Sequence, residues 1–421
     1  MNQTFCVSTN CCAVQRNETY RIAKYLRLNG WSEVNDPSLV NMNVITTCGV
    51  TDITEKDSFK IIDRILDSKK EDGIIVIAGC LPNICIDKLT DKYPGAFYVP
   101  LDNMELFDNI INATIKISDV YYNSNPQFHH STGDPTLDSN LYDDDLRFAK
   151  ALSKKYNDYR FLDCYDYATQ GRYLWKDESI FEVKISSGCT NECSYCASRL
   201  GIGKYRSKSL AQIEKEIRLG YSLGYRKVML MGDELGAYGT DIGCSLLEVL
   251  KLCQDIDPNI RIGIRYIHPD YLVQIFPKLE EFLYKIYFLC VSLQSASPKV
   301  LRLMNRNVNA LQDIRPILKK INECYPNVYL HTQIIIGFPN EDSQDFYLTL
   351  DFLKEFKFDF IRYNAFSARE GTKAYAYSVE YSENELEKRM KIMGEFVKYN
   401  RYERLYSRYQ QLILEHEQGV E

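Results

Sequence analysis

Short apolar segments alternate with helical patterns along two separate stretches of this 421-residue chain, residues 1–115 and residues 180–380. Strands that alternate with helices form parallel sheets, because each helix returns the chain to the start of the next strand. We therefore expect an α/β protein with an N-terminal open parallel sheet and a partial (β/α)6 barrel. Residues 116–179 are expected to form a linker, and residues 381–421 a C-terminal helical segment. The expected strands are 4–8, 43–47, 73–78, 181–185, 227–231, 261–266, 286–293, 328–336 and 360–366, and the clearest helices are 17–28, 56–68, 144–155 and 382–417.

One loop of the expected barrel carries three cysteines, Cys189, Cys193 and Cys196, in the segment Gly-Cys-Thr-Asn-Glu-Cys-Ser-Tyr-Cys. Three thiolates from one loop can hold three irons of a cubane cluster and leave the fourth iron open for a substrate or cofactor. A structural metal site would fill every position with a protein ligand. The alternatives are a zinc knuckle without its fourth ligand, and buried cysteines spaced by accident. Because the loop follows the strand 181–185, we expect it at the carboxyl edge, where barrel enzymes keep their active sites.

Each of the first three expected strands is also followed by a cysteine, namely Cys12, Cys48 and Cys80. The carboxyl ends of parallel strands meet at one edge of a sheet, and open α/β folds place their ligands there. This pattern predicts a second site with three thiolates. The alternative is a set of ordinary buried cysteines, and Cys11 or Cys85 could replace one of the three as a ligand.

Composition limits the location and the partners of the protein. The 14 cysteines occur in a chain whose first twelve residues show no secretion signal, which favours metal ligation and free thiols over disulfides. No apolar run approaches the about 18 residues that a membrane span needs, so we expect a cytoplasmic protein with no membrane partner. The net charge of −6 and the pI of about 5.6 exclude a basic field over the whole chain that would attract nucleic acid.

The cysteine triplet, with Tyr195 before its last cysteine, resembles the signature of the radical S-adenosylmethionine (SAM) superfamily. The resemblance implies that Cys189, Cys193 and Cys196 hold a [4Fe-4S] cluster whose open iron binds the amino and carboxylate groups of SAM. An electron from the cluster then cleaves SAM to methionine and a 5′-deoxyadenosyl radical, which abstracts hydrogen from an unactivated carbon. The resemblance also implies an external electron donor such as flavodoxin or ferredoxin.

The two cysteine sites together narrow the resemblance to the methylthiotransferases, over nearly the whole chain. The segment Thr-Asn-Cys-Cys that ends at Cys12, followed by Glu18, resembles the first cysteine motif of this family, and the alignment selects Cys12 over Cys11. Thr-Thr-Cys ending at Cys48 and Gly-Cys ending at Cys80 resemble the other two motifs. The family thus implies that Cys12, Cys48 and Cys80 bind an auxiliary [4Fe-4S] cluster.

Further motifs of the barrel imply contacts with SAM. A carboxylate at Asp233 or Glu234 suits the ammonium group of SAM, although a loop cap is the alternative role for Asp233. The polar segment with Ser292 and Gln294 is similar to a strand that reaches the ribose or the methionine carboxylate. The Gly-Phe-Pro turn at Gly337 lets the backbone approach a ligand closely. The implied SAM-binding residues are Tyr195, Gly232, Asp233, Glu234, Ser292, Gln294 and Gly337.

The chain also departs from the family pattern at several positions. Arg199 and Ile202 replace the usual proline and arginine, Gln15 replaces an asparagine, and Gln333 replaces an aspartate. These changes could alter contacts with SAM or the substrate while both clusters remain. Family members usually carry a small β-barrel called TRAM after the last helix, and we expect this chain to lack it.

The resemblance implies an enzyme that methylates a cluster-bound sulfur and inserts it at a C–H bond of a tRNA adenosine or a protein aspartate. We favour a peptide or protein substrate, because phosphate contacts dominate nucleic-acid affinity and the chain is acidic. Arg265, His268 and Tyr238 also lie in segments that look like the protein-modifying branch. The tRNA alternative is supported by cations on the last helix, for which a solvated face is the favoured explanation. These cations are Lys388, Arg389, Lys391, Lys398, Arg401, Arg404 and Arg408.

Two other classes of protein remain as alternatives. The first is a radical SAM enzyme whose auxiliary cluster relays electrons or holds substrate and does not donate sulfur. The second is an electron-transfer protein whose clusters only pass electrons, which would need no open iron. Formation of 5′-deoxyadenosine after anaerobic reduction with SAM would exclude the second class.

Overall fold

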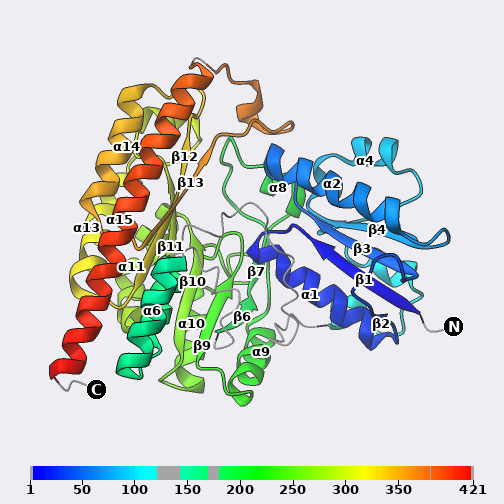
Figure 1. Cartoon of the computed structure of the whole chain (residues 1–421), viewed down its shortest axis with the longest axis horizontal. Helices are drawn as coiled ribbons and strands as arrows, with labels where there is room; N and C mark the ends of the chain where they lie inside the picture. The colour runs from blue at the N-terminus through cyan, green and yellow to red at the C-terminus, as the bar shows by residue number, and fades with distance from the viewer. Residues whose placement is uncertain (1–2, 121–142, 169–179, 380, 419–421) are drawn as a thin grey trace.

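The computed structural model describes residues 3–120, 143–168, 180–379 and 381–418. Two parallel sheets with helices packed against them stand side by side, and a long C-terminal helix runs along the larger one (Figure 1). Most of the expected linker, residues 121–142 and 169–179, lies outside the described residues. Among the helices that are described, none is long and apolar enough to cross a membrane.

The N-terminal domain is an open sheet of five parallel strands in the order β2-β1-β3-β4-β5. The three expected strands are confirmed, and the edge strands β2 and β5 add to them. The central strands β3 and β4 are buried along nearly their whole length, as strands covered on both faces should be. The elements are β1 (Thr4–Thr9), α1 (Ala13–Leu28), β2 (Ser32–Glu33), β3 (Met42–Thr47), α2 (Asp52–Ser68), β4 (Ile74–Gly79), α3 (Leu81–Ile84), α4 (Ile86–Lys92), β5 (Phe97–Pro100), α5 (Leu106–Ile110) and η1 (Ile117–Asp119).

The first two helices begin four residues earlier than expected, and their N-termini explain the difference. α2 begins after a capping box in which the side chains of Thr51 and Thr54 each accept the backbone N–H of the other. Such a box satisfies N–H groups that lack a partner in the first turn. α1 begins directly after Cys12, which occupies the N-cap position. The early start of α1 thus places a strand-end cysteine at a helix N-terminus.

The second domain is a six-stranded parallel sheet in the order β13-β12-β11-β10-β9-β6. All six expected strands are confirmed, and because β13 and β6 remain edges, the sheet forms a partial barrel. Its elements are β6 (Ile180–Lys184), β7 (Ser186–Ser187), α8 (Ser198–Ile202), β8 (Arg206–Ser207), α9 (Leu210–Ser222), β9 (Lys227–Met231), α10 (Leu246–Ile256), β10 (Arg261–Ile267), α11 (Pro269–Leu279), η4 (Glu280–Lys285), β11 (Ile286–Gln294), α12 (Pro298–Leu303), α13 (Ala310–Cys324), β12 (Tyr329–Ile336), α14 (Ser343–Glu355), β13 (Phe360–Ala365) and η5 (Lys373–Ala376).

The two faces of the barrel sheet have different partners. One face is apolar and packs against the surrounding helices through residues such as Leu230 and Leu289. The other face, which we call the inner face, carries Met229, Phe288 and Cys290. Val14 of α1 is buried in the same cluster as these residues. The N-terminal domain therefore covers part of the inner face of the barrel.

A helical layer completes the chain. The expected helices are confirmed as α6 (Asp143–Tyr156) and α15 (Glu383–Gln418), and α7 (Arg160–Ala168) adds to them. Phe161 on α7 packs with Tyr409 on α15 in one buried cluster. Cys164 on α7 also forms a hydrogen bond of 3.2 Å with the hydroxyl of Tyr329 on β12. These contacts fasten the C-terminal helix to the barrel sheet.

Candidate active site between the two domains

The loop with Cys189, Cys193 and Cys196 lies just beyond β6, at the predicted carboxyl edge of the barrel sheet. The strands β7 and β8 pair in antiparallel fashion and close the loop at its base. Gly188 has a φ of +83°, and a Cβ there would lie 3.0 Å from the carbonyl oxygen of Lys204. Only glycine accepts both the left-handed backbone and this close approach, so Gly188 fixes the direction in which the cysteine loop leaves the sheet.

Hydrogen bonds from other parts of the barrel hold this loop in place. The backbone N–H of Ser194 donates to the carbonyl of Met304 at 3.0 Å, and its hydroxyl donates to the carbonyl of Leu303 at 2.7 Å. The N–H of Ala374 donates to the carbonyl of Ser194 at 2.8 Å. The segment that follows β13 and the end of α12 thus position the loop from two sides.

The three thiols of the loop lie in one group and act on one another. Burial raises the pKa of Cys189 to about 12, and Glu234, Cys196 and Cys193 raise it further. Burial also raises the pKa of Cys196, again with a contribution from Cys193. All three cysteines are half-buried. Thiols that are partly shielded by the loop and partly accessible can serve as ligands of a metal cluster bound beside the loop.

The three thiols of the loop can be compared with the requirements of a single ion and of a cluster. Among the described residues, no group of three or more His, Cys, Asp or Glu side chains closes around one metal ion. A tetrahedral zinc site would require such closure. In a cubane cluster each thiolate binds a different iron, so the sulfur atoms stand apart by the width of the cluster. Three thiols on one loop that do not close around a single point are compatible with that arrangement.

The second expected group of thiols also lies together at strand ends. Burial raises the pKa of Cys80, and the thiols of Cys48, Cys11 and Cys12 raise it further. The N–H of Cys80 donates to the carbonyl of Thr47 at 3.0 Å, which joins the ends of β3 and β4. Four thiols therefore gather at the carboxyl edge of the N-terminal sheet, one more than three ligands require.

The adjacent residues Cys11 and Cys12 have different environments. Cys11 is buried, and the hydroxyls of Thr9 and Thr46 on its own sheet hydrogen-bond to its thiol and oppose the burial that raises its pKa. Cys12 is exposed, and Asp233 of the barrel contributes to its raised pKa. Cys12 thus faces the barrel while Cys11 faces its own sheet, which favours Cys12 as the ligand of a group between the domains.

Cys85 lies near the charged groups of Glu55, Lys88 and Arg369, and not near the other thiols of the N-terminal sheet. Burial raises its pKa to about 11, with Glu55 acting in the same direction and Lys88 and Arg369 in the opposite direction. Its thiol lies 3.7 Å from the carbonyl of Leu81 on the helix before it. Cys85 is therefore a poor candidate to replace Cys12, Cys48 or Cys80.

Asp233 lies between the two groups of thiols. Its Oδ2 accepts the N–H of Gly188 at 2.9 Å, so the loop-cap contact considered for this residue is present. Its charge contributes to the raised pKa of both Cys12 and Cys80. Burial raises the pKa of Asp233 itself, and Lys184 acts in the opposite direction. Both thiol groups therefore face one space between the domains.

Buried polar contacts join the domains around this space. The ammonium of Lys184, at the end of β6, donates to Glu18 of α1 at 2.9 Å and to the amide oxygen of Gln15 at 3.4 Å. Arg369, which follows β13, forms an ion pair with Glu55 of α2. The side chains of Lys184 and Glu18 are nearly inaccessible to solvent, so neither domain can release its partner without leaving a buried charge.

Glu234 serves mainly to fasten the cysteine loop. Its carboxylate accepts the N–H of Gly236 at 2.8 Å and that of His268 at 3.1 Å, and it accepts Asn191 of the loop at 3.4 Å. Burial raises the pKa of Glu234 to about 7, although the two backbone donors act in the opposite direction. Both carboxylate oxygens of Glu234 therefore accept hydrogen bonds from the protein. The sequence had instead suggested this carboxylate as a partner for the ammonium group of SAM.

Arg306 is a candidate functional residue that was not predicted from the sequence. Its guanidinium donates to the hydroxyl of Tyr195 at 3.1 Å and to the thiol of Cys193 at 3.7 Å. It also donates to the carbonyl of Ser292 at 2.5 Å. Arg306 is buried. It places a positive charge directly against the cysteine loop.

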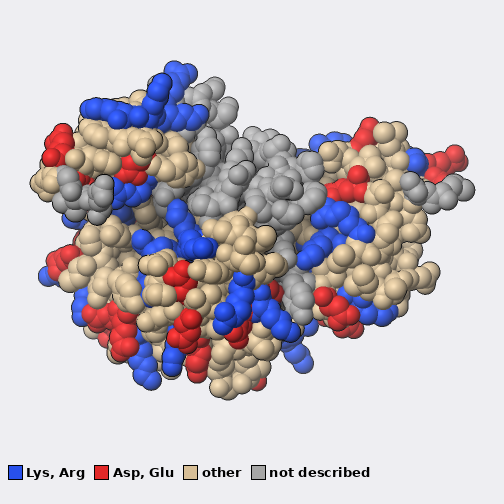
Figure 2. Space-filling view, turned by 90° about the horizontal axis from the view of Figure 1, so that it is seen from below, with Lys and Arg blue, Asp and Glu red and all other residues tan. Residues whose placement is uncertain are grey.

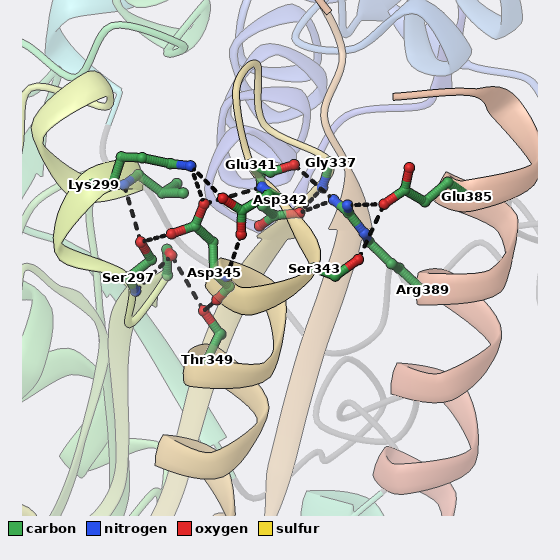
Figure 3. A network of polar contacts seen from close by, with 12 residues as sticks. Ser297, Lys299, Gly337, Glu341, Asp342, Ser343, Asp345, Thr349, Glu385 and Arg389 are labelled. Carbon is green, nitrogen blue, oxygen red and sulfur yellow. Dashed lines mark hydrogen bonds and ion pairs between the residues drawn. The ribbon is translucent and has the colours of Figure 1, made fainter. Parts of the chain in front are cut away.

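The expected contacts Gln294 and Gly337 both lie at strand ends with left-handed backbones, φ +69° and φ +70°. Figure 3 shows a polar network that includes Gly337 and, on the segment after β11, Ser297. Glu341 accepts the N–H of Gly337 at 2.6 Å and Arg389 of α15 at 3.2 Å. On the other side Asp345 accepts the hydroxyl of Ser297 at 2.6 Å. The N-termini of α14 and α15 thus position both turns.

A cavity of about 340 Å³ opens between the domains behind the cysteine loop. Lys184 and Glu18 line its inner end, and Lys208 and Glu216 line its wall. Lys208 forms an ion pair of 2.8 Å with Glu216. The cations of this cavity are thus largely neutralised by carboxylates of the wall.

The cations of the last helix do not form one solvated face. Arg389, Arg401 and Arg408 are buried. Arg408 donates to both oxygens of Asp359 at 2.6 and 2.8 Å, and Arg404 donates to the same carboxylate at 3.1 Å. Only three of the seven, Lys388, Lys391 and Lys398, are exposed. The expectation of a solvated face is therefore wrong for the arginines, because they bind the barrel.

Comparison with known proteins agrees with this site. Residues 183–353 match the radical SAM superfamily, and residues 4–99 match the uncharacterized protein family UPF0004. A probable threonylcarbamoyladenosine tRNA methylthiotransferase of Pyrococcus abyssi is 28% identical over 366 residues, which cover 86% of this chain and 76% of the relative. The ribosomal protein uS12 methylthiotransferase RimO of Acetivibrio thermocellus is 26% identical over 397 residues, which cover 92% of this chain and 81% of the relative.

One further relative and one solved structure are also similar to this chain. A tRNA-2-methylthio-N(6)-dimethylallyladenosine synthase of Thermodesulfovibrio yellowstonii is 27% identical over 372 residues, covering 87% of this chain and 77% of the relative. Among solved structures, the radical SAM methyltransferase TsrM of Kitasatospora setae aligns with a TM-score of 0.53 at 11% identity, covering 87% of this chain and 75% of that one. This structural likeness concerns the fold alone. The chain therefore combines a radical SAM domain with a UPF0004 domain, and relatives named as methylthiotransferases are similar to it along most of its length.

Proposed function

We propose that this enzyme inserts a methylthio group at an unactivated carbon of a peptide or protein side chain. Cys189, Cys193 and Cys196 would hold the [4Fe-4S] cluster that binds SAM, and Cys12, Cys48 and Cys80 would hold the auxiliary cluster. The two clusters and SAM are the cofactors of this family, and they supply the methylated sulfur and the 5′-deoxyadenosyl radical. The observation that carries the proposal is the position of Asp233 between both groups of thiols.

The residues of the site fit these cofactors. Thiolates are the ligands that iron–sulfur clusters use, and each group supplies three from rigid strand ends or a pinned loop. Arg306 places a positive charge beside Cys193, which would offset the negative charge of a cluster bound there. The buried Lys184–Glu18 pair keeps the domains together, so the space between them can exclude water.

The proposed SAM contacts share one edge of the barrel. Gly232 tolerates no side chain, since a Cβ would lie 2.6 Å from the hydroxyl oxygen of Ser186, and this suits close approach of a ligand to the backbone. The residues proposed to line the SAM site are Tyr195, Gly232, Asp233, Glu234, Ser292, Gln294 and Gly337.

Surface charge supports the choice of a protein substrate. The pI is about 5.6, and four of the seven cations of the last helix are used inside the fold or in an ion pair with Asp359. Basic and acidic side chains are interspersed over most of the face shown in Figure 2. A protein that neutralises many phosphates would be expected to present a continuous basic surface.

A tRNA adenosine is the second candidate substrate. The observation that favours it is the similarity to relatives named as tRNA methylthiotransferases, at 27–29% identity over more than four fifths of this chain. Both substrates are consistent with a cytoplasmic location and with flavodoxin or ferredoxin as the electron donor, which we also propose.

Anaerobic reconstitution tests the assignment of ligands. The native chain should bind about eight irons in two cubanes, and the triple change of Cys12, Cys48 and Cys80 to alanine should leave about four. Cys85→Ala is the matched control and should leave the iron content unchanged, and Cys11→Ala distinguishes the two neighbouring thiols. An unchanged iron content in the triple variant would contradict the auxiliary cluster.

Mass spectrometry then tests the reaction. A strain without the gene and its parent are fed methyl-labelled methionine, and tRNA nucleosides, peptides and small molecules are searched for a lost methylthio mark. A mark lost from a protein supports the first candidate, and a mark lost from tRNA supports the second. Loss of no mark under expressing conditions would mean that the auxiliary cluster has a role other than sulfur donation.

A further inference from the structure

A small cavity opens on the inner face of the barrel sheet, below the carboxyl edge that carries the cysteine loop. Its volume is about 40 Å³. Its lining comes from four neighbouring strands, β10 to β13, and includes two arginines, one amide and aromatic rings. The residues that matter here are Arg265, Phe288, Cys290, His331, Gln333 and Arg362.

Two guanidinium groups converge on this cavity from separate strands. Burial raises the pKa of Cys290 to about 12, and both Arg265 and Arg362 act in the opposite direction. Cys290 lies on β11, between β10 with Arg265 and the more distant β13 with Arg362. The charges of two residues that are 97 positions apart thus reach one point of the inner face.

The two arginines differ in their surroundings. Arg265 is 9% exposed, and Glu182 on β6 and Tyr266 interact with its charge. Arg362 is exposed on the edge strand. Within the described part of the chain, no carboxylate forms an ion pair with Arg362. The cavity therefore combines one anchored guanidinium with one that is available to a ligand.

The remaining lining makes the cavity selective. Gln333 pairs in register with Arg362 across β12 and β13, and its uncharged amide neutralises neither arginine. The ring of His331 lies 4.4 Å from that of Phe288 and 5.3 Å from that of Phe360, measured between centroids. These rings reduce the access of water, so a charge-assisted hydrogen bond is stronger here than in bulk solvent.

The size of the cavity restricts what can enter. A cavity needs about 10–15 Å³ of this kind of volume to hold one water molecule, so about 40 Å³ holds a group of a few atoms and no nucleobase. A planar carboxylate matches the fork of a guanidinium, which donates two parallel hydrogen bonds. A phosphodiester would bring two ester arms as well as its oxygens. Size, charge and shape together favour a carboxylate.

We propose that Arg265 and Arg362, with the amide of Gln333, hold the carboxylate of an acidic side chain of the protein substrate at the inner face of the barrel. This inference rests on the proposed function and names the chemistry of its substrate. The carboxylate would anchor the side chain beneath the cysteine loop, so that the neighbouring carbon lies toward the space between the two groups of thiols.

Binding of small probes to the reconstituted enzyme with SAM tests this proposal. The probe is N-acetylaspartate N-methylamide, and its asparagine counterpart lacks only the charge. Anaerobic calorimetry should show binding of the first, with affinity at least about 10-fold greater than for the second, as the loss of a charged hydrogen bond predicts. Arg362→Met should weaken binding of the aspartate probe by about 10- to 100-fold, and Arg362→Lys should restore part of it.

The matched control is Arg315→Met, because Arg315 is a partly exposed arginine of α13 that pairs with Glu355 of α14 and does not line the cavity. It should leave the affinity unchanged. Equal binding of the two probes, binding of neither, or full affinity in Arg362→Met would overturn the carboxylate site. Tighter binding of the nucleoside threonylcarbamoyladenosine, which also carries a carboxylate, or of dimethylallyladenosine would overturn the assignment to an acidic protein side chain.

Two readouts separate this inference from the proposed function. Iron content and the formation of 5′-deoxyadenosine without probe are measured in the native enzyme and in the control Arg315→Met, and they should be the same in both. If the native enzyme forms no 5′-deoxyadenosine, the proposed function fails. If the native enzyme forms 5′-deoxyadenosine but binds the aspartate and asparagine probes with equal affinity, only the proposed carboxylate site is contradicted.

Discussion

A Cβ at Gly201 would lie 2.7 Å from the Cβ of Cys80. Gly201 belongs to α8, the helix that follows Cys196, and Cys80 directly follows β4 of the N-terminal sheet. The segment that follows one group of thiols thus rests directly on a member of the other. Because real Cβ atoms do not approach so closely, a side chain at position 201 must displace one of the two loops.

We predict that Gly201→Ala lowers the iron content of the auxiliary site and leaves that of the Cys189 loop intact. Overpacking of this kind costs about 1–3 kcal/mol of stability, and Cys80 would move away from Cys48. Iron and sulfide analysis with thermal unfolding measures both effects. Gly95→Ala is the control, because nothing lies within 4 Å of a Cβ there. Full occupancy of both sites in Gly201→Ala would show that the contact relaxes freely.

Removal of Lys184 should destabilise the junction between the domains. Lys184→Met leaves the buried carboxylate of Glu18 without one of its partners, and breaking a buried ion pair costs about 3–5 kcal/mol. The remaining contact of Glu18 with Arg21 at 3.2 Å should reduce this loss. The double variant Lys184→Met with Glu18→Leu should regain much of the stability in urea unfolding. Equal stability of the single and double variants would argue against a coupled pair.

Replacement of Arg306 should impair the radical reaction without unfolding the protein. Arg306→Gln removes a positive charge from Cys193, which should lower the midpoint potential of a cluster bound there. Loss of a charge-assisted hydrogen bond should slow formation of 5′-deoxyadenosine by about 10- to 100-fold. A redox titration followed by electron paramagnetic resonance gives the potential. Arg302→Gln, at an exposed position of α12, serves as the comparison and should change neither quantity.

Glu341 should make the stability depend on pH. Burial raises the pKa of Glu341 to about 7 in the folded chain, from its ordinary value of 4.5. The folded state therefore binds more protons than the unfolded state between these values, so stability falls as pH rises from about 4.5 to about 7 and then levels off. The loss attributable to this group is at most about 3 kcal/mol. Glu341→Gln should flatten this part of the profile in denaturant titrations at several pH values, and an identical slope in both proteins would contradict the prediction.

Much of the fold followed from local pattern. The strands around Cys12, Cys48, Cys80 and the Cys189 loop were predictable, because apolar runs of strand length between helical patterns specify parallel sheets. The edge strands β2 and β5 were not, since their two and four residues are too short for a periodic signal. The helix α7 was not predicted either, because its nine residues are too few for a clear helical period and it is stabilised by packing against α15.

The sequence by itself determined that two sets of cysteines lie at the carboxyl edges of two parallel sheets, because chain direction and strand order follow from alternation. It could not decide that Cys12 faces the barrel and Cys11 its own sheet, that Arg306 reaches Cys193, or that Arg265 and Arg362 converge on Cys290. These relationships depend on how the two domains pack and on how the sheet curves. Local periodicity sets the side of a strand on which a residue lies, and only the tertiary structure sets which distant residues meet there.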